Sequence, residues 1–224
     1  MTTAAGTVGL GAVSALGIVL ALITLTSWAG VAQASTSRAT TSCAPRSTTV
    51  DVKSGQARIF HTKNNYVFVC RPGVRRRIGL RFDAEEQLGA CSETVSRLTL
   101  TPYYAAWTSD GNCGAGDPNW TVSVLRISAK AHTQTYPSGA GCQSNCPAGR
   151  FKKAVGPVHR IALTRRGDLA WSAQDQFERR FFEISKVAEG HPVLLARETD
   201  VDPKSVRWRG SLVTWIQAGT THSG

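Results

Sequence analysis

Short runs of alternating apolar and polar residues follow one another along most of the chain after residue 47. In such a run every second side chain faces the same side, so alternation over about four to eight residues predicts a half-buried β-strand. Only FDAEEQLGA has a helical pattern, over about two turns. The sequence therefore predicts an all-β chain. The predicted strands are TTVDVK, ARIFHT, YVFVCR, RIGLRF, SRLTLT, YYAAWTS, TVSVLRIS, RIALT, DLAWSA, RFFEISK, PVLLAR, SVRWR and LVTWIQ.

A unit of strand, tight turn and strand recurs along the chain. SRLTLTPYYAAWTS, RIALTRRGDLAWSA and SVRWRGSLVTWIQA carry Trp107, Trp171 and Trp215 in their second strands, and ARIFHTKNNYVFVC is a looser copy that ends in Cys70. The 44 residues from Trp171 to Trp215 suit a four-stranded propeller blade. The 64 residues from Trp107 to Trp171 suit one blade and an insertion at about 137–156.

These repeats predict an antiparallel, propeller-like domain of about four partial blades over residues 48–224. TTVDVK (48–53) would complete the last blade and close a small ring. A β-sandwich or an open stack of sheets is the alternative.

The segment DLAWSAQDQFERRFFEISKVAEGHPVLL resembles a TolB-type propeller repeat, in which a turn, an apolar-aromatic strand, a polar loop and a second strand recur in each blade. The tail LLARETDVDPKSVRWRGSLVTWIQAG is similar to the closing segment of small, largely uncharacterised exported proteins from actinobacteria. The resemblance covers about residues 55–220. It implies a fold, and it brings no catalytic residues with it.

The tripeptide Arg166-Gly167-Asp168 is known as an adhesion signal. It lies where the second repeat must reverse direction, and the last repeat has Gly210-Ser211 at the same place. Gly tolerates positive φ and Asp suits turns, so turn chemistry accounts for both residues. We expect a hairpin tip.

The first 37 residues hold no charged side chain and include a long apolar run. With small residues at Ala32 and Ala34, this pattern predicts a secretory signal peptide over residues 1–34. No Lys or Arg precedes the apolar run, so a membrane anchor over residues 8–34 is the alternative. A polar spacer, 35–47, follows. The protein is expected to be secreted, or anchored at the cell envelope if the leader is uncleaved.

Six cysteines follow the leader, an even number that in an exported chain predicts disulfides. No Cys-x-x-Cys pair and no His-x-x-x-His accompany them, which argues against zinc. Pairing of chain neighbours is preferred among the 15 connectivities. The predicted bonds are Cys43–Cys70, Cys91–Cys113 and Cys142–Cys146.

The chain has 26 Lys and Arg against 15 Asp and Glu, a net charge of +11, which attracts anionic polymers or lipid surfaces. The densest basic segment is RPGVRRRIGLRF (71–82), which is expected to form a solvated hairpin turning at Pro-Gly, with a binding surface as the alternative interpretation. No nucleic-acid recognition motif is present, so nucleic acid is not expected as a partner. The predicted binding surface comprises Arg71, Arg75, Arg76, Arg77, Arg81 and Trp120. Trp120 is included because it follows a Pro turn, whereas the repeated tryptophans suit a core.

Sequence motifs for enzyme chemistry are missing. The mature chain has no G-x-S-x-G, H-E-x-x-H or P-loop, and its five His residues are scattered. The loop 109–117 lacks the spacing of a calcium loop. In ETDVDP, Glu198, Asp200 and Asp202 are expected to pair with nearby arginines.

The sequence predicts a non-catalytic binding or scaffolding module at the cell envelope, with no cofactor and no metal, engaging an anionic polymer or a protein partner. The alternatives are a secreted hydrolase with a carboxylate cleft built around Asp200 and Asp202, and a membrane-anchored accessory subunit.

Overall fold

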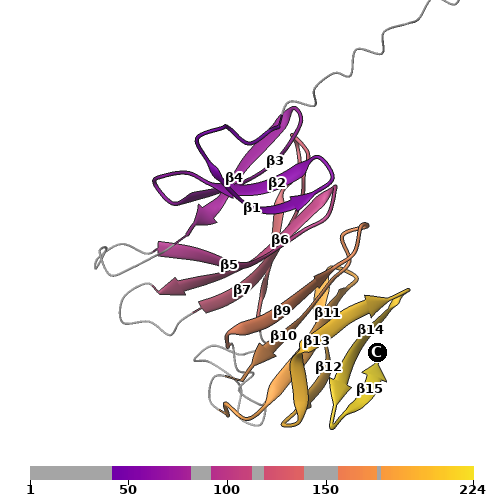
Figure 1. The fold of residues 1–224 in the computed structure, drawn as a ribbon. Coiled ribbons are helices and arrows are strands. Elements are labelled where there is room, and N and C mark those ends of the chain that lie inside the picture. The colour runs from indigo at the N-terminus through magenta and orange to yellow at the C-terminus, as the bar shows by residue number, and fades with distance from the viewer. Residues whose placement is uncertain (1–41, 82–91, 113–118, 139–155, 176–177) are drawn as a thin grey trace, which may run out of the picture. The chain divides into compact units, whose positions relative to one another are not determined.

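The computed structural model describes residues 42–81, 92–112, 119–138, 156–175 and 178–224, and these ranges contain strands and turns but no helix (Figure 1). The all-β prediction is confirmed. The strands are β1 (Thr49–Ser54), β2 (Ala57–His61), β3 (Tyr66–Arg71), β4 (Val74–Leu80), β5 (Ser92–Leu100), β6 (Tyr104–Asn112), β7 (Asn119–Arg126), β8 (Thr133–Pro137), β9 (Val158–Leu163), β10 (Leu169–Gln174), β11 (Phe182–Ala188), β12 (His191–Glu198), β13 (Val201–Arg209), β14 (Leu212–Gln217) and β15 (Thr220–Ser223).

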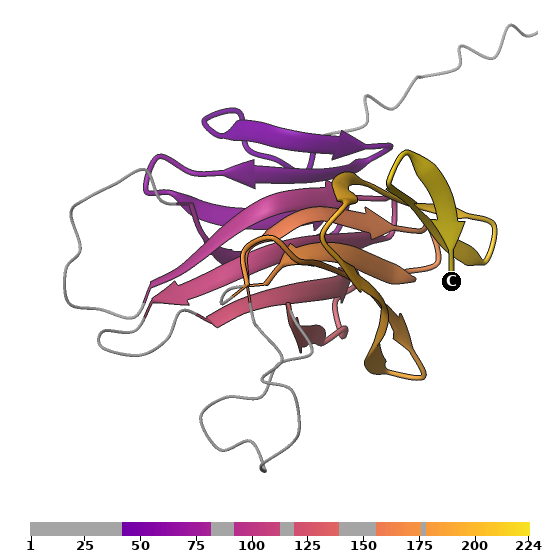
Figure 2. The ribbon, with the colours of Figure 1, turned by 90° about the horizontal axis from the view of Figure 1, so that it is seen from below.

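Hydrogen bonds join these strands into three sheets. β1 to β8 form an eight-stranded sheet, β9 to β12 a four-stranded sheet and β13 to β15 a three-stranded sheet, all with sequential neighbours paired. Every pairing is antiparallel except that of β4 with β5, which meet at a single parallel pair, Leu80 with Thr94. The eight-stranded sheet therefore consists of two four-stranded meanders, which are joined only by this one pair. Figure 2 shows the strands of the first meander side by side. The described chain is a series of antiparallel meanders.

The first strand of each meander shares two features with the first strands of the others. It contacts the first strand of the next meander, β1 with β5, β5 with β9 and β9 with β13. It also carries extra residues opposite its second strand, because the register shifts within every such pair. A β-bulge of this kind bends a strand and re-aims its side chains. The extra residues include Asp51 in β1, Arg97 in β5, His159 in β9 and Lys204 in β13.

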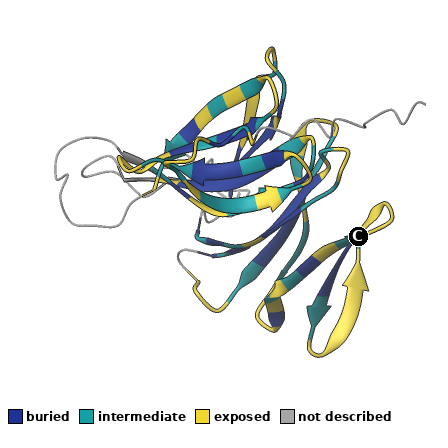
Figure 3. Cartoon of the chain, turned by 45° about the horizontal axis from the view of Figure 1, so that its top comes forward, coloured by how far each residue is buried: buried dark blue, intermediate teal, exposed yellow. Residues whose placement is uncertain are grey.

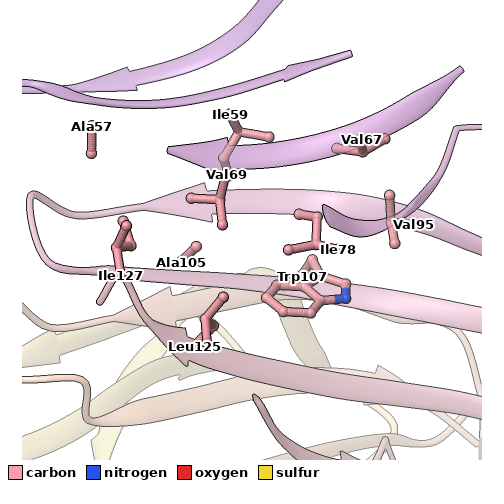
Figure 4. Packing of buried hydrophobic residues seen from close by; sticks show 10 residues of the cluster. All are labelled: Ala57, Ile59, Val67, Val69, Ile78, Val95, Ala105, Trp107, Leu125 and Ile127. Atoms are coloured by element: carbon pink, nitrogen blue, oxygen red, sulfur yellow. The ribbon is translucent and has the colours of Figure 1, made fainter. Parts of the chain in front are cut away.

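The first hydrophobic core lies between the first and second meanders. The apolar side chains of β2 and β3, such as Ile59 and Val69, lie opposite those of β6 and β7, such as Trp107 and Leu125 (Figure 4). These residues occupy alternate strand positions, which is the periodicity that predicted the strands. In Figure 3 the buried positions of the strands are dark blue, whereas β15 is exposed along its length and is yellow.

Two further cores connect the later meanders. Trp171 is buried to 1% exposure among Val122, Tyr136 and Val158, and its ring stacks on Tyr136 at a centroid distance of 6.4 Å. Trp215 lies in a third cluster with Ala170, Ile184, Val206 and others. The prediction that the repeated tryptophans Trp107, Trp171 and Trp215 are core residues is confirmed.

Arg166-Gly167-Asp168 forms the hairpin tip between β9 and β10, as predicted. Thr164 closes the loop: its hydroxyl donates to the Asp168 carboxylate at 2.7 Å, and it accepts the backbone N–H of Asp168 at 3.0 Å. Gly167 has φ of +97°, which L side chains rarely adopt. Turn chemistry therefore accounts for this tripeptide.

Two predictions about the repeat are wrong. ARIFHTKNNYVFVC is the hairpin of β2 and β3, whereas the other copies join the first and second strands of a meander, so the matching unit begins at β1. TTVDVK pairs with β2 and belongs to the first meander; it does not add a strand to β13–β15. Both errors have one cause: alternation looks the same in every hairpin of a meander and does not identify the partner strand.

Two strands, β8 and β15, were not predicted, and FDAEEQLGA lies outside the described residues. The leader, most of the spacer and most of the 137–156 insertion also lie outside them. No apolar helix of membrane-spanning length occurs in the part of the chain that the structure describes.

Candidate functional site: a basic face on the first meander

Positive charge is concentrated in the first meander and the segment before it. Residues 42–81 contain nine Lys or Arg and a single acidic residue, Asp51. Residues 158–224 contain ten Lys or Arg and eight Asp or Glu, which nearly cancel. The field of the described chain is therefore strongest around β1–β4, where an anion would be attracted.

A cross-strand row of basic residues crosses this sheet. Lys53 lies opposite Arg58, Arg58 opposite Cys70, and Cys70 opposite Arg75. Directly opposed residues share a face, so the three cations lie on the side away from the first core. Like charges that face one another destabilise a strand pair, so stability does not explain Lys53 beside Arg58. We call Lys53, Arg58, Arg75 and Arg77 the basic face.

Arg75 and Arg77 are positioned by aromatic rings. The guanidinium carbon of Arg77 lies 4.1 Å from the ring centroid of Tyr66, and that of Arg75 lies 5.8 Å from that of Phe68. Stacking on a ring orients the guanidinium and leaves its N–H groups available to a ligand. Both arginines are exposed, and neither forms an ion pair within the described ranges.

The predicted disulfide Cys43–Cys70 is present and lies in the middle of this face. It ties the segment 42–48 across the outer side of the sheet, where Ala44 packs on Phe60 and Cys70. Arg46 is exposed on the same segment. The bond holds this covering segment among the cations. Cys91, Cys113, Cys142 and Cys146 lie outside the described residues.

The predicted surface of five arginines does not form as one patch. Arg76 points to the core side of β4 and donates to the backbone carbonyls of Ala129 and Ala131. Arg71 lies 5.0 Å from the ring centroid of Tyr103.

Arg81 has a different partner again. It donates to the carboxylate of Asp51 at 2.6 Å, and Asp51 also binds His61 at 2.9 Å. Alternation along β4 explains why Arg75 and Arg77 share one face and Arg76 takes the other.

The expected place of Trp120 on the binding surface is not supported. Trp120 is half-buried at the start of β7, where its carbonyl accepts the backbone N–H of Ser138 at 2.9 Å. It belongs to the second meander, opposite Asp110 of β6. Trp208 packs against the third core and donates to the Ala162 carbonyl at 3.2 Å.

The carboxylates of ETDVDP do not pair with the neighbouring arginines. Arg197 instead binds Asp175 at 2.7 Å and Glu178 at 3.2 Å, and its contact with Asp175 raises the pKa of the guanidinium. Arg197 lies opposite Glu183 of β11, with its Nε 3.7 Å from that carboxylate, so sheet pairing outweighs closeness in sequence. Glu198, Asp200 and Asp202 are exposed.

No group of three or more His, Cys, Asp or Glu side chains that could hold a metal ion occurs within the ranges described above. The candidate site therefore consists of cations and rings, an arrangement that can bind anions. No protein-family model, no curated protein and no solved structure matches this chain.

Lys53, Arg58 and Arg46 were absent from the sequence prediction. The excess of nine basic residues over one acidic residue in 42–81 was a signal for them. Their common face could not be derived without the strand register.

Proposed function

We propose that the protein is an exported, non-catalytic binding module whose basic face holds an anionic polymer of the cell envelope. The observation that carries the proposal is the row of Lys53, Arg58 and Arg75, a costly set of like charges with no acidic residue on its own face among the described residues. A linear polyanion would neutralise these charges in succession.

The geometry suits a polymer better than a small molecule. The cations are spread over β1, β2 and β4, so a chain of repeated anionic groups can contact several of them at once. Each exposed contact is weak, and several together give useful affinity that falls as salt is added. The rings orient Arg75 and Arg77, and hydrogen bonds to the carbonyls of Gly55 and Ala57 hold Arg58, before the ligand arrives.

The same proposal includes a propeller-like fold of TolB type, in which each meander is a blade. It is supported by the succession of three four-stranded meanders and one three-stranded meander, and by the contacts between their first strands. The hydrolase alternative receives no support from the positions of Asp200 and Asp202, which lie exposed at the start of β13.

Co-sedimentation with purified cell envelopes tests the function. The protein is produced in an oxidising compartment and mixed with envelopes at about 0.05 to 0.5 M salt. Envelopes stripped of anionic polymers are the control. We expect binding that weakens steeply with salt and is lost on the stripped envelopes. No binding at low salt, or equal binding to both preparations, would contradict the proposal.

A further inference from the structure

Three cationic or protonatable residues occupy the bulges of three successive first strands. Arg97 lies in the bulge of β5, His159 in that of β9 and Lys204 in that of β13. β9 contacts both β5 and β13, so the strand that carries His159 lies beside each of the other two.

Arg97 is held against the bulge of β9. Its Nε donates to the carbonyl oxygen of Val158, the residue before His159, at 3.2 Å. The Arg97 backbone has φ of +48°, a left-handed conformation that costs energy for a side chain of this size. Bulges and strained backbones re-aim side chains and are enriched at functional sites. Arg97 is an exposed residue.

Lys204 belongs to β13, and its backbone is fixed near the β9 bulge by a hydrogen bond of the preceding residue. The carbonyl of Pro203, the residue before it, accepts a hydrogen bond from the Ser172 hydroxyl of β10. Ser172 pairs with Arg160, and the next pair along is Ala173 with Val158, so His159 lies between these two pairs. The backbone at Lys204 is therefore held beside the bulge that contains His159, and its side chain is exposed.

The positive charge at this junction is not compensated by ion pairs. Neither Arg97 nor Lys204 forms one with any carboxylate that the structure describes. The neighbouring Asp202 carboxylate instead accepts the backbone N–H of Lys204 at 2.9 Å. Two cations without ion pairs near one imidazole form a local field that favours an anion.

This field changes the pKa of His159. Burial lowers the pKa of its imidazole, the nearby charges of Arg97 and Lys204 lower it further, and a hydrogen bond from the imidazole to the Gln174 side chain opposes the shift. The imidazole ring and the Phe182 ring are in T-shaped contact, at a centroid distance of 5.4 Å. An anion that bound between the cations would favour the protonated imidazole.

We propose that Arg97 and Lys204 form a site for an oxyanion group, a carboxylate or a phosphate, at the junction of β5, β9 and β13. The guanidinium fork of Arg97 would contact two oxygens, and the ammonium of Lys204 would supply a further charge. This site uses none of the residues of the basic face and takes a single anionic group.

Proton NMR titration of the histidine rings of the full chain tests the site. The pKa of His159, assigned with His159→Gln, is measured with inorganic phosphate, with acetate and with chloride alone at equal ionic strength. We expect phosphate or acetate to raise the pKa of His159 saturably, with His191 and His222 unchanged. No rise with either anion, or an equal rise of all three histidines, would overturn the proposal.

Two variants separate this site from general screening. Asn tolerates the left-handed backbone at position 97. We expect the anion's affinity, read from the pKa of His159, to fall at least about tenfold in Arg97→Asn and in Lys204→Gln. Arg75→Gln with Arg77→Gln should leave it unchanged, which keeps the result independent of the basic face. An undiminished effect in Lys204→Gln would overturn the proposal.

Discussion

The ring of Tyr104 lies directly against Gly167, so closely that a Cβ at position 167 would come within 2.6 Å of Tyr104 Cε1. Tyr104 begins β6 and Gly167 lies in the β9–β10 hairpin tip, so this contact joins two meanders. The glycine of the tripeptide is thus required by its backbone angle and by its neighbour.

Gly167→Ala is expected to lower the free energy of unfolding by about 3 kcal/mol, since it combines a left-handed alanine with an overlap against a ring. Urea denaturation checks this value. Gly210→Ala is the matched control, because Gly210 has φ of +61° and a Cβ added there would have no neighbour within 4 Å. It should cost only about 1 kcal/mol. Equal costs would contradict the role of Tyr104.

Loss of the Cys43–Cys70 bond should destabilise the fold. The bond closes a loop across 27 residues of sequence, for which chain entropy corresponds to roughly 3 to 4 kcal/mol. The variant with Cys43→Ala and Cys70→Ala isolates this bond, whereas a reductant would act on every cysteine. Urea midpoints of the variant and the wild type give the difference. An unchanged midpoint would mean that the covering segment adds nothing to stability.

Trp171 and Trp107 are expected to respond differently to the same substitution. The Nε1 of Trp171 donates to the carbonyl of Ser138, which is fully buried, whereas Nε1 of Trp107 has no hydrogen-bond partner among the described residues. Trp171→Phe leaves that carbonyl unpaired and should cost about 1 to 3 kcal/mol more than Trp107→Phe. Thermal or urea denaturation of both variants measures this. A larger cost for Trp107→Phe would contradict the assignment.

Stability should fall in mild acid because of His159. Its pKa in the folded protein lies below the ordinary value of 6.5, so the unfolded chain takes up a proton first as the pH falls. The contribution of His159 to folding stability is fully present above that ordinary pKa value, and it is lost as the pH falls through the lowered pKa of the folded protein. Urea midpoints at about pH 7.5 and about pH 5.5 should differ less in His159→Gln than in the wild type. The same difference in both proteins would contradict this.

Alternation predicted most of the strands because most of them have both buried and exposed positions. Each of the runs from TTVDVK to LVTWIQ overlaps a strand, and the recurrence of Trp107, Trp171 and Trp215 identified positions that pack in cores. The strands β8 and β15 were missed because TQTYP and TTHS are almost wholly exposed and have little apolar pattern.

The register of strand pairing could not be predicted from the sequence, and this register decides which cations lie together on the basic face. Alternation along β4 already separates Arg76 from Arg75 and Arg77, but it does not show which of the two faces lies on the core. Lys53 and Arg58 join Arg75 only through the pairing of β1 to β4, which periodicity does not specify. Arg197 likewise finds Asp175 across strands and not the carboxylates beside it in the chain.

Charge removal at the basic face tests the central claim most directly. One variant carries Lys53→Gln, Arg75→Gln and Arg77→Gln, and the control carries Arg166→Gln, Arg207→Gln and Arg209→Gln, three exposed arginines outside the first meander. Both lose the same net charge, so a difference between them reports position. We predict that envelope binding at low salt falls at least about tenfold in the first variant and less than about twofold in the control. Equal losses would show that the +11 charge acts only as a whole, and would contradict a binding site on the first meander.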